Sequence, residues 1–207
     1  MTWTLTDDIA EKNAGVWTLR GPLQAPGNGW QIGCGESSEL DRLLALTSSV
    51  AMPVFQEADR PLEDLVARYR PSAEAGISLD IRYQLLNVSP SRLVLQATYA
   101  IQTREFETHP SLQIAIPGLP ETELATINRA HVGAMHLAVL MQPCDLAQAR
   151  RVDAPQDGGI QFYGDFMERG VIRKCRLRLI LSPLSQQELQ AEEEFEALMR
   201  EPLPLVS

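Results

Sequence analysis

The sequence predicts a single, mainly β domain over residues 1–207: an antiparallel sandwich or strongly curved sheet, with a C-terminal helix packed against it. Two runs of alternating apolar and polar residues, 76–86 and 92–102, are separated by a short turn, which is typical of an antiparallel hairpin. A third alternating run covers residues 171–181. A strong helix signature appears only at the end of the chain, over residues 184–200.

The predicted hairpin has one apolar face in each of its strands. Ser-Pro-Ser at residues 89–91 supplies the turn between them. In the first strand, the residues that share the apolar face are Ile77, Leu79, Ile81, Tyr83 and Leu85. In the second, they are Leu93, Leu95, Ala97, Tyr99 and Ile101. Because side chains alternate across a strand, we expect both strands to be half buried.

The third alternating run also has two distinct faces. Its apolar positions are Val171, Cys175, Leu177, Leu179 and Leu181, and its opposite positions are Ile172, Lys174, Arg176, Arg178 and Ile180. A period of two therefore predicts a strand with one buried face and one solvent-facing basic face.

The remaining segments give weaker signals. Residues 15–22 predict a short strand with Trp17 and Leu19 on one face. The glycine-rich residues 25–38 lack the spacing and preceding buried strand of a phosphate-binding loop, and they predict a turn. Residues 38–52 favour a strand, although a helix stays open.

Three further segments connect these elements. Residues 122–142 could open as a helix capped by Thr122 and end as a buried strand, and the alternatives stay open. Prolines punctuate residues 110–125, and polar residues fill 150–159, so we expect both to be connections.

The C-terminal helix has a defined start and buried face. Ser185 and Glu188 form a capping box. The residues expected along the buried stripe are Ala191, Phe195, Leu198 and Met199. Pro202 ends the helix, and the glutamates at 192–194 and 196 are expected on the solvated face.

Composition limits the function. The net charge of −9 disfavours nucleic acid and anionic membranes as partners. The sequence contains no apolar run long enough for a membrane helix, and its acidic start does not resemble a signal peptide. Three dispersed cysteines predict no disulfide framework. These features favour the cytoplasm of a bacterium.

No set of residues predicts catalysis, a metal site or a cofactor. His131 and His136 are five residues apart and would lie on opposite faces of a strand, so we expect no chelating pair. His136 sits among apolar residues and is expected in the core. Cys175, on the apolar face of its strand, is expected to be an inert buried thiol.

The basic face of residues 171–181 is the candidate binding site. Lys174, Arg176 and Arg178 would project about 7 Å apart along one strand face, as an anion-binding groove or a contact for an acidic partner. The interpretation that we favour is structural: pairing with acids such as Asp80, or cover from the acidic final helix.

Three stretches support a resemblance to a known family. They are "LEDLVARYRP", "LQATYAIQTREFETHP" and "YGDFMERGVIRKCRLRLIL", followed by the tail "PLPL". Together they resemble a family of uncharacterised bacterial proteins, from about Trp17 to the end of the chain. The resemblance implies no activity, cofactor or catalytic residue.

We therefore expect a non-catalytic binding or assembly protein, with a protein partner or a second copy of itself. One alternative is a small-molecule or anion-binding protein that uses the basic strand face. The other is a carboxylate-based hydrolase acting on sugars, for which the candidate acids are Asp64, Asp80, Glu105, Glu107 and Asp165.

Overall fold

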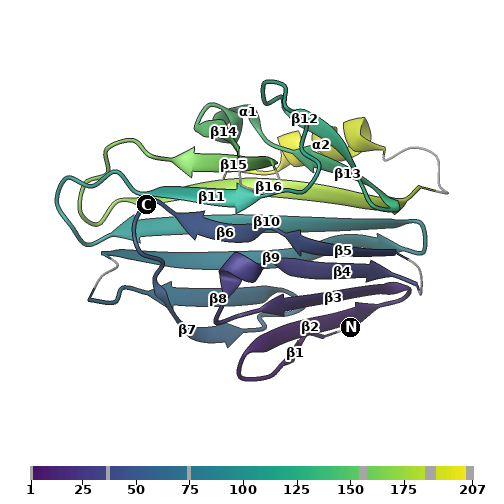
Figure 1. Ribbon diagram of the computed structural model, residues 1–207, viewed down its shortest axis with the longest axis horizontal. Coiled ribbons are helices and arrows are strands. Elements are labelled where there is room, and N and C mark those ends of the chain that lie inside the picture. Colours follow the sequence, from purple (N-terminus) through teal and green to yellow (C-terminus); the bar gives the residue numbers. More distant parts are fainter. Residues whose placement is uncertain (1, 36–37, 74–75, 154–157, 185–189, 204–207) are drawn as a thin grey trace.

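The computed structural model describes residues 2–35, 38–73, 76–153, 158–184 and 190–203. Within them, the chain forms strands β1 to β16, a short 3-10 helix and two α-helices (Figure 1). The strands pair antiparallel throughout the described residues. The predicted mainly β architecture with a C-terminal helix is confirmed.

One layer is a seven-stranded sheet with the order β12-β13-β16-β10-β9-β8-β7. Its strands are β7 (Val54–Asp59), β8 (Leu65–Arg70), β9 (Ile77–Ser89), β10 (Arg92–Thr103), β12 (Ile127–Val132), β13 (Met135–Leu140) and β16 (Ile172–Pro183). The long β9–β10 hairpin is the one predicted from its alternation, and β16 covers the third alternating run. These three long strands form the centre of the sheet.

The second layer contains two smaller sheets. The five-stranded sheet has the order β1-β2-β3-β4-β5, and the four-stranded sheet has the order β14-β15-β11-β6. Their strands are β1 (Thr4–Leu5), β2 (Ile9–Ala14), β3 (Trp17–Pro22), β4 (Trp30–Cys34), β5 (Ser38–Leu43), β6 (Ala45–Ser48), β11 (Ser111–Ala115), β14 (Ala149–Asp153) and β15 (Gly158–Tyr163). The 3-10 helix η1 (Pro26–Asn28) precedes β4.

Leu44 joins the two sheets of the second layer. Its φ of 59° is left-handed, so the chain bends there between β5 and β6. Its backbone N–H donates to the carbonyl oxygen of Ala115 at 2.9 Å. Leu44 is 1% exposed, and this burial compensates for a backbone conformation that costs a branched residue free energy.

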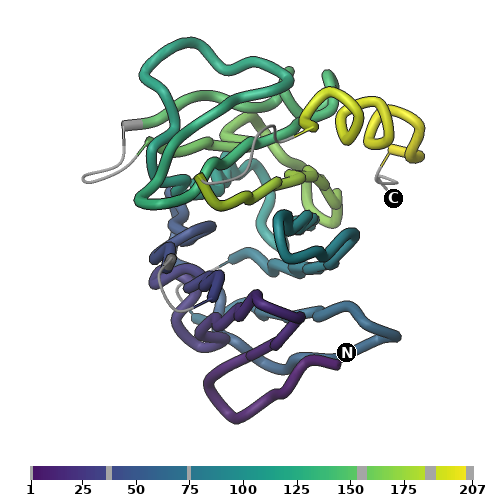
Figure 2. The backbone as a smooth tube through the Cα atoms, turned by 90° about the vertical axis from the view of Figure 1, so that its right-hand side faces the viewer, coloured from purple at the N-terminus to yellow at the C-terminus, as the bar shows by residue number. Residues whose placement is uncertain are grey.

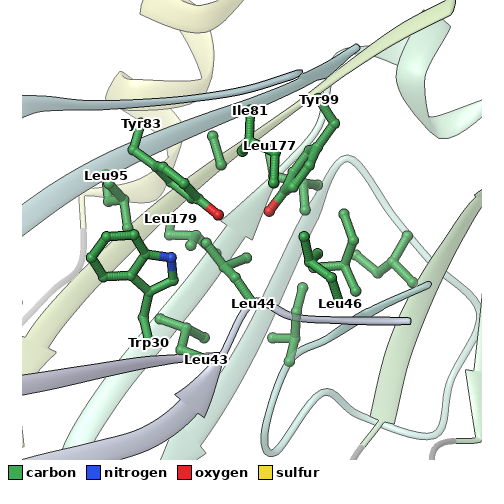
Figure 3. Close-up of a cluster of buried hydrophobic side chains, with 14 of the residues drawn as sticks. Trp30, Leu43, Leu44, Leu46, Ile81, Tyr83, Leu95, Tyr99, Leu177 and Leu179 are labelled. Carbon is green, nitrogen blue, oxygen red and sulfur yellow. The ribbon is translucent and has the colours of Figure 1, made fainter. Parts of the chain in front are cut away.

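The core lies between the layers. Figure 3 shows Trp30, Leu43 and Leu46 from the second layer facing side chains of the seven-stranded sheet. The rings of Trp30 and Tyr83 meet edge to face, with their centroids 4.8 Å apart. The hydroxyls of Tyr83 and Tyr99 point toward one another in the same view. The apolar faces predicted for β9, β10 and β16 therefore supply one side of the core.

The C-terminal helix α2 (Ala191–Arg200) covers the other face of the seven-stranded sheet. Ala191 and Leu198 are buried there, in a cluster formed with Val94, Ala138, Leu140 and Ile180. Figure 2 shows this helix, in yellow, on the outside of the molecule and away from the N-terminal strands. The side-chain amide of Gln142 donates to the carbonyl oxygen of Leu198 at 2.8 Å. It thereby gives a hydrogen-bond donor to a backbone carbonyl in the last turn of the helix.

The helix differs from the expected one at its start and on its surface. It begins at Ala191, and Gln190 before it has a left-handed φ of 45°. The expected capping pair, Ser185 and Glu188, lies outside the described residues. Of the expected buried stripe, Phe195 is partly buried and Met199 is 46% exposed, so the prediction for Met199 is wrong. A short helix that contacts the sheet on one side buries a narrower stripe than the sequence pattern suggests.

Several segments expected to be turns or loops are strands. They are β4 in residues 25–38, β11 in residues 110–125, and much of β14 and the start of β15 in residues 150–159. Residues 38–52 contain β5 and β6, as favoured, and residues 122–142 contain the hairpin β12–β13 with no helix opening it. These strands are short, and pairing with their neighbours in the sheets outweighs weak local propensity; for β11 those neighbours, β6 and β15, are distant in sequence.

A one-turn helix, α1 (Pro143–Leu146), follows β13. Among the described residues, no helix combines the length and apolar character that a membrane crossing requires.

Candidate functional site

A groove with several charged and polar side chains lies on the outer face of the seven-stranded sheet, beside α2. It is a groove of about 310 Å³ over the central strands, lined by Asp80, Arg82, Gln96, Thr98, Lys174 and Arg176 among others. We call it the sheet groove.

Strand register explains why the face is hollow. On the middle strand β10, Thr98 pairs with Arg82 on β9 and with Arg176 on β16. One step along, Ala100 pairs with Asp80 and Lys174. Short side chains on the middle strand therefore lie between longer ones on both neighbours, and the difference in length forms the groove.

Most of the charges in the sheet groove are already paired. The guanidinium of Arg70 donates to Asp80 Oδ1 at 2.5 Å. Arg82 Nε donates to Asp64 Oδ2 at 2.7 Å. At the helix side, Arg176 Nη1 donates to Glu201 Oε2 at 2.8 Å. These pairs fix the long side chains around the groove and leave little unbalanced charge there.

Lys174 differs from these residues. Its side chain is half buried at the wall of the groove, and among the described residues it has no ion pair or hydrogen bond. Within the described parts of the chain, its ammonium group is therefore a positive charge of this groove without an acidic partner.

Arg178, the third residue of the predicted basic face, lies outside the groove and beneath α2. It is 1% exposed, so the prediction of a solvent-facing side chain is wrong. Its guanidinium donates to Gln96 Oε1 at 2.7 Å and also pairs with Glu194 and Glu201. The favoured explanation, cover from the acidic final helix, is confirmed for Arg176 and Arg178. Asp80 pairs with Arg70 instead.

Arg178 belongs to a hydrogen-bond chain that crosses the sheet. Gln96 accepts from Arg178 and donates to Gln84 Oε1 at 3.2 Å. Gln84 in turn donates to Asp64 Oδ2 at 3.1 Å. This series of hydrogen bonds connects the C-terminal helix to the loop before β8 and holds the floor of the groove in one arrangement.

The predicted carboxylates do not gather at this groove. Asp80 lines it, whereas Asp64 sits beside Arg82 at its margin. Asp165 lies 3.8 Å from Arg150, a residue of β14 in the other layer. Glu105 and Glu107 follow β10 in an exposed loop. Sequence reasoning named Asp80 but missed Gln96 and Thr98, although all three lie on the polar parity of their strands.

The cysteines are poor nucleophiles in this environment. Burial raises the pKa of the Cys175 thiol well above its ordinary value, and burial also raises the pKa of Cys34 and of Cys144. Cys175 is 0% exposed, as expected for an apolar strand face. A protonated, sealed thiol neither attacks a substrate nor binds a metal readily.

The histidines are placed differently from the prediction. His131 and His136 lie opposite each other on β12 and β13, with ring centroids 4.6 Å apart. His131 is exposed and His136 half buried, so His136 is not a core residue. The prediction assumed one continuous strand, whereas a turn at Gly133 and Ala134 folds the segment back on itself. The spacing "HVGAMH", symmetric about a glycine-containing two-residue turn, was the signal for this pairing.

No family model matches the chain, and no curated protein matches it. The predicted resemblance to an uncharacterised bacterial family therefore stays a prediction.

Two solved structures are similar in shape. The periplasmic domain of the Thermotoga maritima YidC aligns with a TM-score of 0.48 and 7% identity, over 97% of this chain and 96% of that chain. A protein described as a kojibiose phosphorylase from the human microbiome aligns with a TM-score of 0.36 and 8% identity, over 90% of this chain and 22% of that chain. At these scores neither likeness carries an argument about function.

Proposed function

We propose that this protein is a non-catalytic binding protein whose ligand is a small anionic molecule held in the sheet groove. The observation that carries the proposal is Lys174. Its ammonium group is unpaired among the described residues, while Asp80, Arg82 and Arg176 around it are each held by an ion pair. A polar surface on which Lys174 has no partner among the described residues favours a carboxylate or phosphate group at that point.

The rest of the groove suits a polar ligand. Thr98 and the amide of Gln96 offer hydrogen-bond groups on the floor, and their positions are held by the chain through Gln84. Such a surface is organised before the ligand arrives, which lowers the entropy cost of binding. Hydrolysis of sugars is less well supported here, because Asp80 is the acidic side chain among the described lining residues and Arg70 already holds it.

The test is thermal unfolding in phosphate or sulfate against sodium chloride at matched ionic strength. An anion at ten times its dissociation constant raises the free energy of unfolding by about 1.4 kcal/mol. For a chain of this size, that corresponds to a rise in melting temperature of about 3–5 °C.

Lys174→Gln should abolish the difference between phosphate and chloride. The matched control is Arg150→Gln, which removes an exposed positive charge from the other layer and should keep the difference. The proposal is wrong if phosphate has no effect on the natural protein, or if the control loses the effect as fully as Lys174→Gln does.

Association with a second copy or another protein is the competing form of binding, and Phe106 favours it. This side chain is 76% exposed, in the loop after β10, with the guanidinium of Arg169 5.2 Å from its ring centre. If this surface associates, light scattering should give a mass that rises with concentration, and Phe106→Ser should lower it. A constant monomer mass at high concentration excludes self-association.

The free state of Cys34, Cys144 and Cys175 supports placing the protein in a reducing compartment such as a bacterial cytoplasm. Labelling of thiols in intact cells tests this placement, since extensive disulfide formation there would contradict it.

A further inference from the structure

A second cleft separates the β12–β13 hairpin from the start of α2. Its volume is about 580 Å³, and it is lined by Arg129, His131, His136, Glu192 and Glu193 among others. Nothing in the proposed function uses this cleft, which lies at the edge of the sheet rather than over its central strands.

The hairpin holds the two imidazoles together. The turn at Gly133, with its left-handed φ of 56°, makes His131 and His136 direct cross-strand partners. Their ring planes are inclined by 66°, with the centroids 4.6 Å apart. Both residues line the cleft, and His131 is exposed. Rotation about side-chain bonds can therefore turn one nitrogen of each ring toward a common point.

The charges around the pair favour a cation. Arg129 is neutralised by Glu192 across the cleft. Glu193 lines the same cleft, and among the described residues its carboxylate has no ion pair or hydrogen bond. The carboxylate of Glu193 therefore adds negative charge at the helix side of the cleft.

The ligand types select the class of metal. Imidazole nitrogen suits Cu²⁺, Ni²⁺ and Zn²⁺, whereas Ca²⁺ and Mg²⁺ require several oxygen ligands. Metal–nitrogen distances of about 2.0–2.1 Å bring two imidazoles close together, as this hairpin does. No group of three or more His, Cys, Asp or Glu side chains in the described parts of the chain is arranged to hold a metal. The site would therefore have two protein ligands and complete its coordination with water.

We propose that His131 and His136 form a two-imidazole chelating site for a divalent transition metal, with Glu193 supplying the favourable charge. Cu²⁺ binds most tightly, followed by Ni²⁺ and Zn²⁺, because affinity follows the general order for nitrogen ligands. Two imidazoles held on paired strands bind a metal better than two independent ones, since the folded hairpin has already brought them together.

Titration calorimetry with NiCl2 tests the site directly. One ion should bind per chain, and excess chelator should reverse the binding. His131→Asn and His136→Asn should each weaken the affinity by more than about tenfold, since losing even an outer-shell partner of a metal site costs that much. His109→Asn is the matched control, because His109 lies beside Phe166 in another part of the molecule and should leave binding unchanged.

Electron paramagnetic resonance of the natural protein with one equivalent of Cu²⁺ supplies a readout that needs no variant. The expected spectrum shows coupling to two imidazole nitrogens. The proposal is overturned if His131→Asn binds the metal with unchanged affinity, or if His109→Asn loses affinity as much as the variants of the pair do. A spectrum that shows coupling to a single imidazole would also overturn it. The circular dichroism of each variant should match that of the natural protein, because His131 is exposed.

Discussion

Asp145 is a buried acid whose removal should stabilise the protein in a pH-dependent way. It lies in the one-turn helix α1, is 1% exposed, and has one carboxylate oxygen, Oδ2, with no hydrogen-bond partner among the described residues. Burial raises the pKa of Asp145 from 3.8 to about 6, and a hydrogen bond from the backbone of Arg176 together with its charge opposes that rise in part. The carboxyl group is therefore easier to protonate in the folded protein than in the unfolded chain.

The sign and size of the effect follow from this shift. Because the folded pKa is the higher one, the stability that protonation of Asp145 contributes is fully present below pH 3.8 and is lost as the pH rises through about 6. The difference of roughly two pH units corresponds to about 3 kcal/mol at about 1.4 kcal/mol per unit. At neutral pH, Asp145 is ionised in the folded protein, and its buried charge lowers the free energy of unfolding by this full amount.

Asp145→Asn removes this titration while keeping the acceptor for the backbone of Arg176. The free energy of unfolding of the variant, relative to the natural protein, should rise by about 2.5 kcal/mol between about pH 4 and about pH 7.5. The absolute gain at neutral pH will be smaller, because the new amide N–H groups are buried without partners at a cost of about 1–3 kcal/mol. The change with pH is therefore the quantity to measure.

Urea unfolding over a series of pH values gives this quantity. Asp165→Asn is the matched control: that side chain is 65% exposed, so its variant should differ from the natural protein by a nearly constant amount. A pH-independent difference for Asp145→Asn would refute the reasoning, and so would a difference that grows toward acid pH.

Three further predictions concern the fold. Leu177→Ala should lower the free energy of unfolding by about 2–5 kcal/mol, because the side chain is 0% exposed between the layers and its loss leaves a cavity; chemical denaturation measures it, and a loss below about 1 kcal/mol would contradict the packing. Arg178→Ala should cost about 2–4 kcal/mol and release α2, seen as faster amide exchange in that helix; the value lies below that of a fully buried pair because Glu201 is 34% exposed. Gly29→Ala should cost more than about 1 kcal/mol, since the residue has a φ of 70° and an added Cβ would lie 2.7 Å from the backbone of β5; an unchanged melting temperature would be inconsistent with this close approach.

Alternation within a strand was readable from the sequence alone. The face that β9, β10 and β16 turn toward the core was predicted residue by residue, and buried Tyr83, Tyr99 and Leu177 confirm it. The prediction succeeded because a strand's period of two is a local property that neighbouring residues reveal together. Short strands such as β11 escaped prediction, since five residues with little alternation gain their stability from distant partners.

The candidate sites depended on contacts that no local pattern contains. Lys174, Arg176 and Arg178 have the same parity and nearly the same sequence surroundings. Yet, among the residues that the structure describes, the first lies in a groove without an ion pair, the second is paired at the groove wall and the third is buried beneath a helix. Their difference comes from where α2 is placed on the sheet, which is set by apolar contacts with Val94 and Ile180.

The sequence by itself determined that this chain would form antiparallel strands, each with one apolar face, and that an acidic helix would follow them. Only the tertiary structure decided which charged side chains stay in water and that His131 meets His136. The physical reason is that the side a residue faces is fixed by bonds to its immediate neighbours, whereas its partner across a sheet is fixed by turns and register elsewhere in the chain.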